Sequence, residues 1–198
     1  MPADLSGSWE RDYSRGEDVQ GALNALFYAR NRQLQQRQQY PGDPGMASRS
    51  SMSQKEANSI MALARLVEQI TQPDVLTISQ DEYEVRVARE DDFSMSCTFY
   101  EGVAQRTDSS YGTEVCSWDG KDLISHLVLP DGLLISHRLT TSADGNYLRV
   151  ITTASSSATR TPFTLHRFYL RFEAPPSGFN CIETLSMKRV CSTGEIKP

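Results

Sequence analysis

After Pro73 the apolar residues change from helical spacing to alternation, and this change constrains the fold more than any other feature of the sequence. Alternating segments of strand length continue to residue 172 and are separated by Asp119-Gly120, Asp131-Gly132 and Asp144-Gly145. Asp-Gly pairs favour the tight turns that join antiparallel neighbours. With one earlier strand the series has about nine members, near the number at which a twisted sheet closes on itself. We therefore expect a mainly β fold, an antiparallel up-and-down β-barrel. Its expected strands cover residues 5–13, 74–80, 82–88, 93–100, 111–118, 121–129, 133–141, 147–155 and 163–172.

A helical insert separates the first strand from the others. Ser14-Arg15-Gly16-Glu17 and Ser53-Gln54-Lys55-Glu56 both have the form of a capping box. Apolar residues at helical spacing follow each box, and a Pro/Gly-rich segment, 40–45, divides the two runs. We expect two amphipathic helices, the second ending before Pro73. The chain is then a single domain, 1–198, with a helical insert at 14–72, a barrel at 74–172 and a tail at 173–198.

Composition excludes some classes of protein. The net charge of −5 and the pI near 5.2 argue against nucleic-acid binding. No run approaches the ~18 consecutive apolar residues of a membrane-spanning helix. The first residues show no basic and apolar leader, which favours a cytoplasmic location, or a periplasmic or secreted one if a leader has been removed.

The four cysteines are too few for a disulfide scaffold and form no C-x-x-C pair. Ordinary buried or free thiols are the favoured interpretation for all four. A bridge between Cys181 and Cys191 stays open, because their spacing in sequence does not give the distance between them.

The turns predict which side chains face the barrel interior. If Asp131-Gly132 is a two-residue turn, His126 lies opposite His137, and the Asp144-Gly145 turn places His137 opposite Thr152. The face that these three residues share is the more apolar one, so we expect it to line the interior. We expect this face to form a ligand site made of His126, His137 and Thr152 with the apolar residues Ile124, Ile135 and Val150.

The sequence leaves open which face of the last strand, 163–172, points into the barrel. One buries His166, Phe168 and Leu170, whereas the other buries Leu165, Arg167 and Tyr169. A buried guanidinium is costly unless an anion meets it. An inward Arg167 and Tyr169 would therefore imply a ligand with a carboxylate or phosphate group.

Gly7-Ser8-Trp9 in the first strand resembles the G-x-W motif of the calycin superfamily, the lipocalins and fatty-acid-binding proteins. The helical pair after the first strand is similar to the fatty-acid-binding branch, and Arg167-x-Tyr169 resembles the R-x-Y pair with which that branch grips a lipid carboxylate. The resemblance implies a lipid-binding transport protein with a fatty-acid-like ligand inside the barrel. It gives Gly7 and Trp9 structural roles, with Trp9 closing one end of the barrel beneath a stacked arginine.

The chain also departs from that family. Its helices are about twice the length of the family's lid helices, and the linker 41–52 and the tail from Ala174 are additions. The family arginine before the penultimate hairpin would fall near Arg138, but the predicted register points Arg138 outward, so its role is not carried over.

Other functions lack sequence support. No G-x-S-x-G, P-loop, H-E-x-x-H or G-x-G-x-x-G motif is present, so we expect no enzyme activity and no cofactor. Two facing histidines without a third ligand favour no metal site. Two alternatives stay open. One is a filled barrel that binds a protein partner through its long helices and tail, with Arg30, Arg32 and Arg37 in the contact surface. The other is an enzyme that uses His126 and His137. Transient membrane contact through the helices is also open. The sequence leaves the oligomeric state open.

Overall fold

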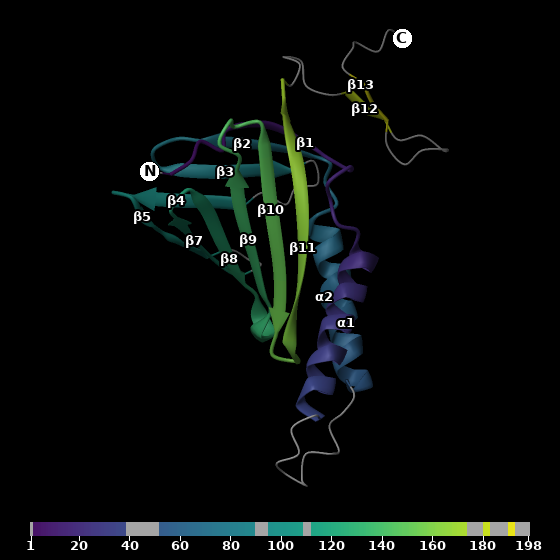
Figure 1. Cartoon of the computed structure of the whole chain (residues 1–198). Helices are drawn as coiled ribbons and strands as arrows, with labels where there is room; N and C mark the ends of the chain where they lie inside the picture. The colour runs from purple at the N-terminus through teal and green to yellow at the C-terminus, as the bar shows by residue number, and fades with distance from the viewer. Residues whose placement is uncertain are drawn as a thin grey trace.

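The computed structural model describes residues 2–38, 52–89, 95–108, 112–173, 180–182 and 190–192. Eleven antiparallel strands form one sheet in the order β5-β4-β3-β2-β1-β11-β10-β9-β8-β7-β6, which curls into a nearly closed barrel (Figure 1). The predicted barrel with a two-helix insert is confirmed. The strands are β1 (Gly7–Arg11), β2 (Val75–Gln80), β3 (Glu84–Arg89), β4 (Met95–Tyr100), β5 (Val103–Ala104), β6 (Arg106–Asp108), β7 (Thr113–Asp119), β8 (Asp122–Val128), β9 (Leu134–Thr141), β10 (Tyr147–Ser156) and β11 (Thr159–Phe172).

The sheet has two strands more than the sequence predicts. The additional strands, β5 and β6, lie at the two ends of the sheet order and are only two and three residues long. Segments this short do not repeat the alternation that identifies a strand. β1 pairs with both β2 and β11, so the first predicted strand joins the two ends of the meander.

The helices are α1 (Val19–Gln38) and α2 (Gln54–Ile70), which lie beside the lower part of β11 (Figure 1). Leu63, Ala64 and Val67 of α2 form a buried cluster with inward-facing residues of the β10–β11 hairpin. These hairpin residues are Ala154, Phe163 and Leu165. α2 therefore covers the inner face of the sheet at one end of the barrel. Neither described helix is long and apolar enough to cross a bilayer.

One of the two predicted caps is wrong. Ser53 caps α2 as predicted, since its hydroxyl accepts a hydrogen bond from the Glu56 N–H at 3.2 Å. α1 begins later than the first capping box, and Asp18 accepts from the Gly21 N–H at its start. Ser14 donates to Asp12 instead, because the chain stays paired with the barrel up to this point.

β4 and β7 meet along a seam of the barrel. Among the described residues no ladder of backbone hydrogen bonds joins these two strands. A disulfide between Cys97 and Cys116 crosses the seam, with 5.6 Å between their Cα atoms. The expectation of unbridged thiols is wrong for this pair, because barrel closure places two strands opposite each other that local patterns do not relate.

The other two cysteines lie in a separate pair of strands, β12 (Asn180–Ile182) and β13 (Val190–Ser192). The backbone register places Cys181 directly opposite Cys191. Their side chains lie outside the described residues, and the predicted alternative of a bridge between them stays a prediction.

Candidate functional site

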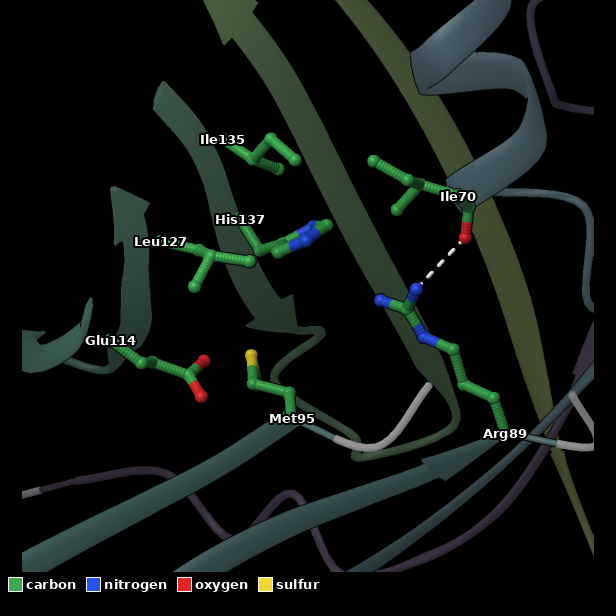
Figure 2. Close-up of a pocket in the computed structure, with 7 residues that line it drawn as sticks. All are labelled: Ile70, Arg89, Met95, Glu114, Leu127, Ile135 and His137. Carbon is green, nitrogen blue, oxygen red and sulfur yellow. Dashed lines mark hydrogen bonds between the residues drawn. The ribbon is translucent and has the colours of Figure 1, made fainter. Parts of the chain in front are cut away.

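A small cavity lies inside the barrel where the end of α2 meets five strands (Figure 2). Its volume is about 40 Å³, which suits a few water molecules at roughly 10–15 Å³ each. The residues that line the cavity are Ile70, Arg89, Met95, Glu114, Leu127, Ile135 and His137.

A row of polar side chains crosses the inner face of β8, β9 and β10. Ser125 lies opposite His137. His137 lies opposite Thr152, as the Asp144-Gly145 turn predicted. All three are buried. The Nδ1 atom of His137 is 3.0 Å from the Thr152 hydroxyl oxygen, and the Ser125 hydroxyl donates to the Glu114 carboxylate at 2.7 Å.

His137 is held as a neutral imidazole. Burial, together with the charge of Arg89, lowers the pKa of His137 from 6.5 to about 3. A neutral imidazole has one donor and one acceptor nitrogen, and Thr152 engages one of them. Among the described residues no hydrogen bond is made by the other ring nitrogen, which can donate to or accept from a polar group of a ligand.

The buried His137 makes stability depend on pH. The unfolded histidine takes up a proton near pH 6.5, whereas the folded one does so only near pH 3. Above pH 6.5, His137 therefore causes no loss in the free energy of unfolding. Below pH 6.5 this residue lowers the free energy of unfolding by about 1.4 kcal/mol per pH unit. Urea unfolding between about pH 5 and pH 7 should show a shallower slope for His137→Asn than for the wild type. His126→Asn, on the outer face, is the control, and equal slopes for the two variants would contradict this account.

The structure contradicts the inward placement of Ile124 and His126. His126 is exposed and lies opposite Ser136 on the outer face, with Ile124 on the same side of β8. The connection between β8 and β9 is a 3₁₀ turn, Pro130–Gly132, closed by a hydrogen bond from the Leu129 N–H to the Leu133 carbonyl. This turn has one residue more than the predicted one, so every side chain of β8 moves to the other face.

This change also separates the two predicted histidines. His137 points into the barrel, and His126 lies on its surface, so they do not share a site. The alternative of an enzyme that uses both histidines required them to face each other, and the structure does not place them so. The predicted lining residues Ile135 and Val150 do face inward, with 3% and 5% of their surface exposed.

Arg167 and Tyr169 face the interior, which decides the parity of the last strand. Arg167 lies opposite Val150, and Tyr169 lies opposite Arg11. Only 4% of Arg167 is exposed; its Nη1 atom donates to the Glu17 carbonyl, and its Nε is buried without a partner. Burial and the nearby Arg11 lower the pKa of Arg167, and burial raises the pKa of Tyr169.

Sequence reasoning missed a second arginine of the interior. Arg89 ends β3, and its Nη1 donates to the carbonyl of Ile70, the last residue of α2, at 2.8 Å (Figure 2). Its Nε is buried without a partner, and burial lowers the pKa of this guanidinium. The signal was available, because Val85, Val87 and Arg89 alternate. The predicted strand stopped one residue too early to include it.

Two adjoining hollows of about 300 and 210 Å³ lie outside the cavity, where α2 meets the barrel. Both are lined by Arg11, Glu68 and Arg167, and we call them together the junction groove. Arg65, Gln69 and Gln72 add polar groups to the larger hollow. Arg167 thus forms part of the wall between the groove and the barrel core.

Comparison with known proteins found no relative: no family model matches the chain, and no curated protein matches it. Its chemistry is that of its own side chains, which are two enclosed guanidiniums, a neutral imidazole and several hydroxyls among aliphatic residues. Such a set can orient an anionic or polar group beside an apolar lining.

Proposed function

We propose that this protein binds a small amphipathic molecule with an acidic head group, such as a fatty acid, and carries it in the barrel. One observation carries the proposal. Arg167 is a buried cation, and within the described residues its guanidinium donates a hydrogen bond to a backbone carbonyl only. Within the described chain no carboxylate lies within ion-pair distance, 4.0 Å, of Arg167 or Arg89.

The positive charge of Arg167 therefore has no ion-pair partner among the described residues. Enclosing a guanidinium costs free energy that a neutral carbonyl offsets only in part. A carboxylate would supply a full opposite charge and accept two N–H groups in parallel, including the unpartnered Nε. In the proposal, the Tyr169 phenol, on the same face of β11 as Arg167, would add a hydroxyl donor.

The two parts of the ligand would occupy different places. The larger hollow of the junction groove, at about 300 Å³, is at the lower end of the range for small-molecule sites. In the proposal, the acidic head group would lie there against Arg167, with Arg11 and Arg65 also in the lining. The 40 Å³ cavity is smaller than an acyl chain, so the apolar part would enter between α2 and the β10–β11 hairpin as α2 shifts. Burial of apolar surface would contribute about 25 cal/mol per Å².

The architecture supports a distant relationship with the calycins, which we include in the proposal. Gly7 and Trp9 lie in β1, the helices follow that strand, and the barrel completes the pattern. The expected arginine over the face of Trp9 is Arg171, at 4.3 Å from its guanidinium carbon to the ring centroid. A transport role rests on the same resemblance.

Displacement of a fluorescent fatty acid tests the proposal. Arg167→Gln should weaken binding by roughly 10-fold or more, because a hydrogen bond to a charged group contributes about 1.5–3 kcal/mol. Arg149→Gln is the matched control, since Arg149 is exposed on the outer face of the neighbouring strand and should leave affinity unchanged. Absence of probe binding by the wild type, or equal losses in both variants, would contradict the proposal.

We infer, as a second candidate function, a protein-interaction module. The observation behind it is the small volume of the cavity described inside the barrel, about 40 Å³. On α1, Arg32 is exposed, whereas Arg30 forms an ion pair with Glu56 at 3.5 Å. The side chain of Arg37 lies outside the described residues. If the wild type binds no acidic amphiphile, Arg32→Glu should disrupt a partner complex, and an unchanged complex would argue against this use of the helix.

A further inference from the structure

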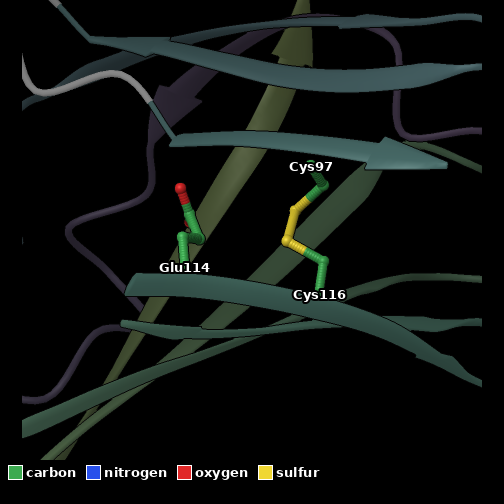
Figure 3. Close-up of side chains that lie close together, drawn as sticks. All are labelled: Cys97, Glu114 and Cys116. Carbon is green, nitrogen blue, oxygen red and sulfur yellow. A yellow bond between two sulfur atoms is a disulfide. The ribbon is translucent and has the colours of Figure 1, made fainter. Parts of the chain in front are cut away.

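The seam between β4 and β7 carries a second set of chemical groups beyond the proposed ligand site. Cys97 and Cys116 face each other across it, and both are almost fully buried, at 1% and 3% exposed. Glu114 lies two residues before Cys116 and points to the same inner face (Figure 3). Its carboxylate oxygen and the two sulfur atoms all lie within 4.8 Å of one another.

The disulfide does not explain why a carboxylate lies beside it. Glu114 is half-buried and accepts the Ser125 hydroxyl at 2.7 Å. Among the described residues it has no lysine, arginine or histidine within ion-pair distance. A hydrogen bond that orients a carboxylate is also the support that metal-ligating carboxylates have in proteins.

We propose that, when the disulfide is reduced, Cys97, Cys116 and Glu114 bind a thiophilic divalent cation, Zn²⁺. Two thiolates and a carboxylate are ligands that zinc prefers, and the cation would give the Glu114 carboxylate an opposite charge. Cysteines that form disulfides in oxidising compartments stay reduced in the cytoplasm. The cation would then take over the cross-link between β4 and β7 that the disulfide makes in the oxidised chain.

Zinc binding that starts from the oxidised chain would take two steps. A thiol reductant transfers two electrons and two protons to the S–S bond, which breaks to give two thiols, while the reductant becomes a disulfide. Zn²⁺ then binds both sulfurs and releases the two thiol protons to solvent. Glu114 binds as its carboxylate and releases none.

The fourth ligand position would be open. Glu114 also lines the 40 Å³ cavity, which has room for a water molecule beside this carboxylate (Figure 2). Arg89 lines the same cavity, so its positive charge lies near the proposed site. The three ligands of that site carry three negative charges, whereas Zn²⁺ carries two positive charges. The arrangement therefore resembles three-ligand zinc sites with a solvent position.

Metal retention by the reduced full-length chain tests this inference. The protein is reduced without oxygen, mixed with Zn²⁺, desalted and measured for zinc per chain; Co²⁺ provides a thiolate charge-transfer band as a second readout. We expect one ion per chain in the reduced protein and none in the oxidised protein. Cys181→Ser/Cys191→Ser, which keeps only the seam thiols, should retain the ion, whereas Cys97→Ser/Cys116→Ser should lose it.

Two further variants distinguish Glu114, the proposed ligand, from Ser125, the residue that orients it. Glu114→Gln should weaken zinc binding strongly, and Ser125→Ala should weaken it by about 10–100-fold, the usual effect of removing a group that orients a ligand. If the reduced chain unfolds without metal, added Zn²⁺ should refold it, as followed by circular dichroism. Retention no greater than that of the Cys97→Ser/Cys116→Ser variant, or failure of zinc to refold an unfolded reduced chain, would overturn the inference.

Discussion

Trp9→Ala is expected to lower the free energy of unfolding by about 3–5 kcal/mol, the range for removing a large buried aromatic side chain. Trp9 is fully buried in the barrel core, and its Nε1 donates to the Leu5 carbonyl at 3.0 Å. Arg171 covers the ring and donates to the carbonyls of Ser6 and Gly145. Alanine would leave a cavity and remove the surface on which Arg171 lies.

Urea denaturation at neutral pH measures this loss. Trp9→Phe is the graded control, because it keeps most of the volume and an aromatic face but loses the hydrogen bond to Leu5. It should cost about 1–2 kcal/mol. A loss below about 1 kcal/mol in the alanine variant would show that the strand end repacks without Trp9.

Gly7 belongs to the same arrangement. Its φ of +127° is a conformation that side chains other than glycine rarely adopt, and a Cβ atom there would lie 2.6 Å from Nη1 of Arg171. The G-x-W motif therefore combines a glycine that admits the arginine with the tryptophan that the arginine covers.

Loss of the Cys97–Cys116 disulfide is expected to lower the free energy of unfolding by about 3 kcal/mol. The two cysteines are 19 positions apart, and closing a loop of this size removes about that much conformational entropy from the unfolded chain. For a chain of this length the melting temperature should fall by roughly 6–12 °C. The seam strands β4 and β7 should lose protection first, because no described ladder joins them.

Calorimetry with a chelator present, so that no metal replaces the bridge, measures this effect. The comparison is made in the Cys181→Ser/Cys191→Ser background, so that only the seam bridge is reduced. Addition of a reductant should lower the melting temperature of the protein with this background. It should leave the melting temperature unchanged when Cys97→Ser/Cys116→Ser is added to the same background. A melting temperature that a reductant changes by less than about 2 °C would contradict a stabilising role.

Two hairpins show why one prediction was confirmed and the other was wrong. The Asp144-Gly145 connection placed His137 opposite Thr152, as the structure has it. The Asp131-Gly132 connection includes Pro130, whose fixed φ suits the first position of a short helical turn. That turn adds one residue, and a shift of one residue exchanges the two faces of β8. His126 moved to the surface, and Ser125 took its place beside His137.

By itself, the sequence determined what depends on local periodicity and local caps. Alternation identified nine of the eleven barrel strands, helical spacing identified both helices, and Ser53 marked the start of α2. These features depend on residues close along the chain, so a single pattern is enough to determine them.

Only the tertiary structure decided how these segments meet. Pairing with β10 and β1 turned Arg167 and Tyr169 inward, and closure of the barrel brought Cys97 to Cys116. The end of α2 met Arg89 inside the barrel. Strand register, seam contacts and enclosed charges depend on loop geometry and on surfaces far apart in sequence, and alternation carries no information about either.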